Sequence, residues 1–170
     1  MSKYATYDEQ GRLTGFMEVA DPPPGERNDS TLFRLEDNPR MTRLGDHQDI
    51  EEANLPNLIV RNNRIMVRDP LPKVPAPNRS TVRANNSEEV VISALPKNTN
   101  VKIVPLNADG SDAEPYGSGY YAPGAHVWSS YEATLADGRL RAAFTLPGRY
   151  RIEIDPFPYR PFKVFVNAHD

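Results

Sequence analysis

The side chains best suited to bind a metal ion lie between residues 47 and 52. His47, Asp49, Glu51 and Glu52 offer one imidazole and three carboxylates. Their spacing places them neither on one face of a helix nor in a known zinc pattern. The segment therefore favours a solvated helical turn, and we predict no metal site there.

A second group of oxygen-bearing side chains occupies residues 107–114, NADGSDAE. Oxygen ligands two residues apart before a glycine are typical of an EF-hand calcium loop. Aligning Gly110 with the glycine of such a loop puts Pro105 at the first ligand position and Tyr116 at the last. Neither side chain supplies the required carboxylate, so the segment predicts a β-hairpin turn.

No group of residues has the spacing of a catalytic site. The chain contains no cysteine, which excludes thiolate catalysis and disulfides. Residues 117–121, GSGYY, lack the strand–turn–helix setting of a nucleophilic serine. Glu88 and Glu89 are neighbours and would point to opposite faces of a strand, so they cannot act together as acid and base. We predict a non-enzymatic protein with no catalytic residues and no cofactor.

Charge and hydropathy restrict the partners. Twenty basic and 23 acidic residues are well mixed, with a net charge of −3, which indicates no nucleic-acid footprint and no polybasic membrane patch. No apolar run approaches the roughly 20 residues that span a bilayer. The opening MSKYATYDEQG lacks the apolar region of a secretory signal. We expect synthesis in the cytoplasm without membrane insertion.

The first part of the chain predicts two β-hairpins separated by an irregular region. Seventeen prolines against ten glycines point away from long helices. Residues 3–19 form one hairpin pattern with a glycine-bearing turn, and residues 57–68 form another around two asparagines. Between them we expect a short strand at 31–37 and a helical turn at 46–53.

A stiff spacer is predicted at residues 69–78, DPLPKVPAPN, where four of ten residues are proline. It separates an extended N-terminal segment, residues 1–68, from a second domain, residues 79–170. After the spacer, short runs of β-forming residues alternate with turn signals, a pattern typical of a β-sandwich. The strands are expected near residues 80–84, 89–93, 100–105, 127–133, 139–145, 149–155 and 162–167.

Two of these strands are expected to form a hairpin. Asp137-Gly138 stands between YEATL and RLRAAF, and Asp-Gly is a strong signal for a tight hairpin turn.

The last strands have a clear inward face. Alternation in residues 149–155 turns Tyr150, Ile152 and Ile154 toward the core, and the Tyr150 hydroxyl can return to a nearby backbone group. PFPYRP then interrupts the ladder, because proline cannot donate a hydrogen bond. A final strand follows with Phe165 exposed. Whether the two aromatic residues of the interruption, Phe157 and Tyr159, cap the core or contact a partner stays open.

The order of these segments resembles a known family. The proline-rich lead, EEVVISALPKNTNVKI, YEATLADGRLRAAF and PGRYRIEIDPFPYRPFKVFV are together similar to the C-terminal Ig-like domains of accessory virion proteins in tailed bacteriophages. The opening YATYDEQGRLTGF is similar to the N-terminal hairpin of such proteins. The resemblance implies a mostly β protein with an Ig-like β-sandwich, in which Tyr150 is the tyrosine-corner residue. Trp128 lies on a different strand from the core tryptophan of antibody domains.

The N-terminal segment is expected to dock on other virion proteins. Ordering a residue costs roughly 1–2 kcal/mol of backbone entropy, and this segment offers few clustered apolar residues to offset that cost. Burial against a partner is therefore favoured over folding back on the sandwich. The expected contact residues are Tyr4, Tyr7, Leu13, Phe16 and Met17.

An aromatic segment, residues 115–132, is the strongest candidate contact surface in the second domain. Its rings, set among glycine and serine, are Tyr116, Tyr120, Tyr121, Trp128 and Tyr131. Tyrosine and tryptophan in such a setting suit a protein interface, and stacking on a host glycan is a second use. The alternative is that Trp128 and one tyrosine fill the core.

These interpretations converge on assembly rather than catalysis. We expect a structural component of a tailed-phage virion, made in the host cytoplasm, that docks by its N-terminal segment and displays an Ig-like domain. The tail tip or baseplate is the first placement expected. Capsid decoration or a head fibre, and a carbohydrate- or receptor-binding module, are the alternatives.

Overall fold

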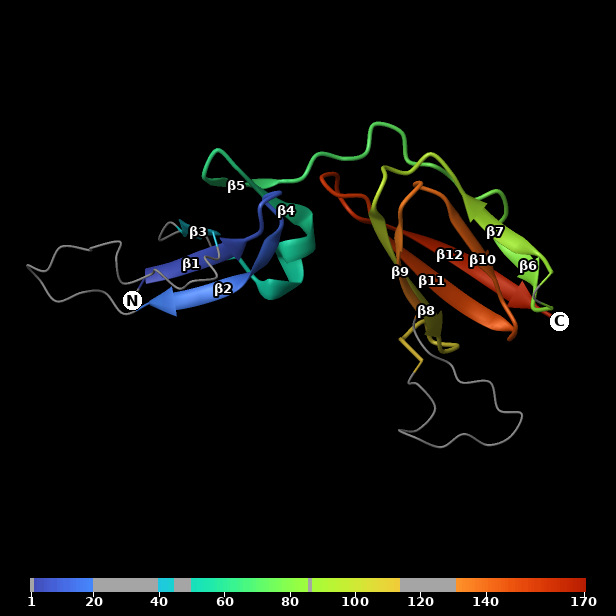
Figure 1. Ribbon diagram of the computed structural model, residues 1–170. Helices are drawn as coiled ribbons and strands as arrows, with labels where there is room; N and C mark the ends of the chain where they lie inside the picture. The colour runs from blue at the N-terminus through green and yellow to red at the C-terminus, as the bar shows by residue number, and fades with distance from the viewer. Residues whose placement is uncertain (1, 20–39, 45–49, 86, 114–130) are drawn as a thin grey trace, which may run out of the picture. The chain divides into compact units, whose positions relative to one another are not determined.

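The computed structural model describes residues 2–19, 40–44, 50–85, 87–113 and 131–170, and the chain divides into two compact units (Figure 1). The first unit is Met1–Asp69 and the second is Pro70–Asp170. Strands dominate both, and no α-helix occurs among the described residues. The predicted mostly β class is confirmed. The division falls within the proline-rich segment.

The first unit contains a three-stranded antiparallel sheet in the order β2–β1–β3. Its strands are β1 (Ser2–Tyr7), β2 (Leu13–Val19) and β3 (Arg40–Arg43). The predicted hairpin at 3–19 is confirmed by the pairing of β1 with β2. The Asp8 carboxylate closes its turn by accepting the backbone N–H groups of Gln10 and Arg12, each at 2.9 Å. β3 was not predicted, and the strand expected at 31–37 lies outside the described residues.

The second predicted hairpin is also present, as β4 (Leu58–Arg61) and β5 (Arg64–Val67). Asn62 and Asn63 form its turn with φ angles of 50° and 59°, the left-handed conformation that asparagine tolerates. A 3₁₀-helix, η2 (Glu52–Asn57), precedes it. Residues 46–49 of the helical turn expected at 46–53 lie outside the described residues, and in its second half helical structure begins only with η2 at Glu52.

The first unit has a small core of its own. Its buried apolar residues are Ala5, Leu13, Leu44 and Val60. The β1–β2 turn docks directly on β4, where the Val60 N–H donates to the Gly11 carbonyl oxygen at 2.8 Å. A Cβ on Gly11 would lie 2.3 Å from the Val60 carbonyl oxygen, so only glycine permits this approach. We expected an extended segment with little core, and the difference arises because apolar residues distant in sequence meet here.

The second unit is a β-sandwich. One sheet has five strands in the order β6–β12–β11–β8–β9, and the other pairs β10 with β7. β6 runs parallel to β12, and the other pairs are antiparallel. The strands are β6 (Thr81–Arg83), β7 (Glu89–Ile92), β8 (Thr99–Leu106), β9 (Tyr131–Leu135), β10 (Leu140–Ala143), β11 (Gly148–Asp155) and β12 (Phe162–His169).

The sandwich core forms between the two sheets. Val90 and Ile92 of β7 and Leu140 of β10 belong to the same buried cluster as Ile152 of β11 and Val166 of β12. All five are at most 2% exposed. Alternating apolar residues of both sheets therefore supply one continuous core, as the sandwich pattern predicted.

The hairpin predicted at Asp137-Gly138 is wrong, although the turn itself is present. β9 pairs with β8, and β10 pairs with β7 in the other sheet. The turn is held by the Leu95 N–H, which donates to the Gly138 carbonyl oxygen at 3.0 Å. Gly138 has φ +71°, and a Cβ there would lie 2.0 Å from the Leu95 carbonyl oxygen. The Asp-Gly signal identifies a tight turn, but long-range apolar burial decides which strands pair.

The predicted faces of the last strands are confirmed. Tyr150, Ile152 and Ile154 are buried, and Phe165 is 46% exposed. The Tyr150 hydroxyl donates a hydrogen bond of 2.9 Å to the Leu146 carbonyl oxygen. The Tyr150 ring also packs on Phe144, with ring centroids 4.4 Å apart.

Candidate functional site

Two separate segments line the edge of β8. Tyr131, the first residue of β9, lies opposite Ile103. The Ala113 N–H donates to the Pro105 carbonyl oxygen at 2.9 Å. The two ends that flank residues 114–130 are therefore fixed two positions apart along one strand. We call residues 107–113 together with Tyr131 the loop base.

The turn within the loop base confirms the hairpin turn predicted for this segment. The Asn107 N–H donates to the Ser111 carbonyl oxygen at 2.8 Å, and the Gly110 N–H donates to the Asn107 carbonyl oxygen at 2.9 Å. An isolated bridge between Leu106 and Asp112 continues the antiparallel pairing beyond the turn. The backbone hydrogen bonds of the turn are thus made within the chain.

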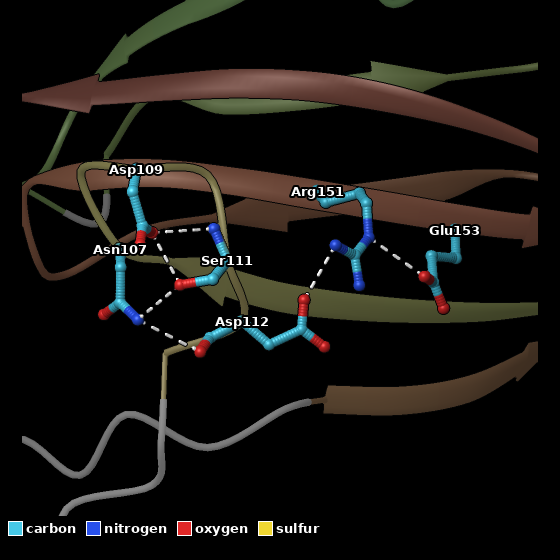
Figure 2. Close-up of polar contacts among 6 residues, drawn as sticks. All are labelled: Asn107, Asp109, Ser111, Asp112, Arg151 and Glu153. Carbon is cyan, nitrogen blue, oxygen red and sulfur yellow. Dashed lines mark hydrogen bonds and ion pairs between the residues drawn. The ribbon is translucent and has the colours of Figure 1, made fainter.

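Side chains also close this turn (Figure 2). Asp109 Oδ1 accepts hydrogen bonds from the Ser111 N–H at 2.9 Å and from the Ser111 hydroxyl at 2.5 Å. Asn107 Nδ2 donates to Ser111 Oγ at 3.0 Å and to the Asp112 carbonyl oxygen at 3.1 Å. The Ser111 hydroxyl holds the pKa of Asp109 below its ordinary value. These contacts give the Asp109 carboxylate a structural role in the turn.

Arg151 of β11 ties the loop base to the middle of the sheet. Its Nη1 lies 2.8 Å from Asp112 Oδ1, and its Nε lies 2.9 Å from Glu153 Oε1 (Figure 2). The hydrogen bond from Arg151 lowers the pKa of Asp112, and the same bond raises the pKa of Arg151. The Arg151 side chain is 16% exposed, whereas that of Asp112 is 62% exposed, so water reaches this contact from the aspartate side.

Two buried apolar residues share the outer face of the sheet with Arg151. Val104 lies opposite Arg151, and Leu106 lies opposite Asp112. Residues directly opposite in an antiparallel pair share a face, so these side chains point away from the sandwich core. Both apolar residues are nevertheless buried, at 5% and 7% exposure. Arg151 reaches Asp112 across β8, so its side chain shares this outer face with them.

A row of alternating charges crosses the same outer face. Lys163 lies opposite Glu153, Glu153 opposite Lys102, and Lys102 opposite Glu132. Lys102 Nζ lies 3.6 Å from Glu132 Oε1. We call these four residues, on β12, β11, β8 and β9, the charge row.

The structure places the predicted contact residues of the second unit in different settings. Tyr116, Tyr120, Tyr121 and Trp128 lie outside the described residues, and so does the start of the strand expected at 127–133. Tyr131 is 58% exposed at the loop base. The two aromatic residues of the segment between β11 and β12, Phe157 and Tyr159, are both half-buried.

The contact residues predicted in the first unit divide between its core and its surface. Leu13 is buried in the small core, and Tyr7 and Phe16 pack against that core. Tyr4 and Met17 lie opposite each other across β1 and β2, and both are half-buried. Alternation places this pair on the other face of the sheet.

Within the described ranges, no cluster of three or more histidine, cysteine, aspartate or glutamate residues could hold a metal ion. His47 and Asp49 fall outside those ranges, and Glu51 is exposed. A search of the same ranges finds no helix of the length and hydropathy needed to span a membrane.

Sequence reasoning missed Arg151–Asp112 and the charge row. Alternation turns Arg151 outward, but its partner depends on the β8 register and on the bridge at Leu106. The only signal in the sequence was that the outward residues of RYRIEID are charged, and that Lys102 and Lys163 carry the charge opposite to that of Glu153.

Comparison of the chain with known protein families, with curated protein sequences and with solved structures finds no match.

Proposed function

We propose that the protein is a non-enzymatic structural component of a tailed-phage virion. Its first unit docks on other virion proteins, and its second unit is displayed as an Ig-like domain. The tail tip or baseplate is the favoured location. The mechanism is assembly, in which strand pairing and apolar burial at subunit contacts hold the protein in place.

The strand order of the second unit is the observation that carries the proposal. Counted along this unit, the third, sixth and seventh strands (β8, β11, β12) share one sheet, and the second and fifth (β7, β10) pair in the other. This order corresponds to the C–F–G and B–E arrangement of Ig-like sandwiches, which supports the proposal of an Ig-like domain. The hydrogen bond from Tyr150 to Leu146 has the form of a tyrosine corner. Many cell-surface domains share this sandwich architecture, which supports a displayed, structural role.

The first unit offers a strand suited to docking. Ile59 of β4 is bridged to Arg12 on one side and paired with Met66 of β5 on the other, so β5 is the outer strand. Met66 and Val67 are 50% and 58% exposed, and successive residues of a strand point to opposite faces. An added strand from a neighbouring subunit would cover both side chains while pairing with β5.

A receptor- or glycan-binding module is the second candidate, and the loop base favours it. Ala113 and Tyr131, which flank residues 114–130, are fixed two positions apart along β8. Arg151 forms an ion pair with Asp112 beside them. A rigid base reduces the entropy that a displayed segment loses on binding. If this segment binds a glycan or receptor, Trp128→Ala or Tyr121→Ala will lower attachment without lowering thermal stability. A large loss of stability would instead place these rings in the core.

The docking proposal is tested by truncation. A phage from which the coding region of this chain has been deleted is complemented with residues 70–170 or with the whole chain, and purified particles are compared by quantitative mass spectrometry. The truncated form should fold, since its core lies within 82–168, but should not enter particles. Normal occupancy by the truncated form would contradict docking by the first unit. Location on the capsid rather than the tail would favour the decoration or head-fibre alternative.

A further inference from the structure

The charge row on the outer face of the five-stranded sheet is self-complementary. Its signs run plus, minus, plus, minus from Lys163 through Glu153 and Lys102 to Glu132. The four charges sum to zero, and neighbouring strands space them about 4.8 Å apart. A second row read in reverse presents the opposite sign at every position.

We propose that this face binds a second copy of the chain across a two-fold axis. The axis lies between the two facing sheets, parallel to the strands and above the midpoint between Glu153 and Lys102. This operation places Lys163 against Glu132 of the second copy and Glu153 against its Lys102. All four contacts across the interface then join opposite charges. The proposal does not rest on a location in a virion.

Other arrangements of two copies lack this match. A two-fold axis along the row would place each residue against its own copy, which sets like charges together at all four positions. Like-charge contacts at an interface suppress the wrong partner. The row therefore selects one orientation, in which β11 faces β8 and β12 faces β9 of the second copy. The facing strands run in opposite directions, and aligned packing of two sheets at about 10 Å separation suits them.

The side chains of the row are accessible. Lys102 and Glu132 are 45% and 71% exposed, and Glu153 is 34% exposed. Beside the row, Phe165 is an exposed aromatic residue with the Arg149 guanidinium 4.9 Å from its ring centroid. Burial of this ring would add an apolar contribution to an interface otherwise made of charge pairs.

The test uses two charge-reversal variants. Each should self-associate weakly alone, and the two should associate with each other when they are mixed. Glu132→Lys turns the row into plus, minus, plus, plus, and Lys163→Glu turns it into minus, minus, plus, minus. The homodimer of each variant contains two like-charge contacts. A heterodimer of the two variants restores opposite charges at all four contacts. Sedimentation velocity of the full chain at low salt measures the dissociation constants.

Matched control variants distinguish an effect of the charge row on self-association from an effect of net charge. Glu9→Lys and Lys97→Glu make the same charge changes at exposed turn residues that do not belong to the row. Circular dichroism confirms that each variant is folded. We expect the wild-type chain and both controls to self-associate, with weaker association as salt increases.

The expected result is a loss of roughly 10-fold or more in self-association for each single reversal, with recovery to within about 3-fold of wild type in the equimolar mixture. A monomeric wild-type chain at all accessible concentrations would overturn the proposal. So would row variants that associate as tightly as the controls, or a mixture that associates no better than its components.

Discussion

Ala113 and Tyr131 lie two positions apart along β8, although residues 114–130 separate them in the sequence. Ala113 donates to the Pro105 carbonyl oxygen, and Tyr131 lies opposite Ile103. One residue in extended conformation, opposite Val104, would join them. The edge strand of the sandwich is thus interrupted at a single point, where residues 114–130 are inserted.

This geometry predicts that residues 114–130 are dispensable for folding. Replacing residues 114–130 by one threonine should give a continuous edge strand and change the midpoint of thermal unfolding by less than about 4 °C, or roughly 1 kcal/mol. Far-UV circular dichroism during heating measures this. A fall of about 15 °C or more would instead assign Trp128 or a neighbouring tyrosine to the core.

The Tyr150 hydroxyl should stabilise the corner before β11. Tyr150→Phe keeps the ring contact with Phe144 but removes the hydrogen bond to Leu146. We expect a loss of about 1 kcal/mol in the free energy of unfolding, measured by urea denaturation. Tyr131→Phe is the matched control, because that tyrosine is exposed and should lose almost nothing. Equal effects of the two substitutions would contradict the role of the corner.

Two glycines with positive φ should respond differently to alanine. Gly138→Ala brings a Cβ within 2.0 Å of the Leu95 carbonyl oxygen, whereas a Cβ on Gly110 meets nothing within 4 Å. Gly110→Ala should therefore cost about 1–2 kcal/mol from backbone strain alone. Gly138→Ala should cost several kcal/mol more, because the turn must separate from Leu95. Similar losses in urea denaturation would show that the turn is not held against Leu95.

The Arg151–Asp112 contact should make the second unit sensitive to acid. The pKa of Asp112 is lowered in the folded chain by the hydrogen bond from Arg151. Its stabilising contribution is complete above the ordinary aspartate pKa, about 3.9, and is lost as the pH falls from there through the lowered folded value. Asp112→Asn should reduce stability at neutral pH and flatten this acid loss.

Thermal unfolding of wild type and Asp112→Asn between neutral pH and pH 2 measures the effect. Glu153→Gln, which removes the other carboxylate on Arg151, serves as a comparison. Parallel pH profiles for wild type and Asp112→Asn would show that Asp112 contributes no acid sensitivity.

Local signals in the sequence predicted most of the strands. Asn62-Asn63 indicates a tight turn because asparagine accepts a left-handed backbone, and both residues adopt it. The alternation around Ile152 indicates which side chains face the core, and this is confirmed. These features depend on neighbouring residues, so a single sequence contains them.

Features that depend on distant residues were less predictable. β9 and β10 join different sheets because Leu140 is buried with Ile92, which the Asp-Gly turn does not reveal. The contact between Arg151 and Asp112 requires the register of β8 with β11 and the bridge at Leu106. The small core of the first unit likewise depends on Val60 meeting the β1–β2 turn.

The central claim is that the chain is part of a virion. The most direct measurement is immunogold electron microscopy of gradient-purified particles of a phage that encodes the chain, with antibodies raised against residues 70–170. Our account predicts gold at one structural location, the tail tip or baseplate in the favoured placement. Purified particles that carry no label, together with free chain detected in the lysate, would contradict it.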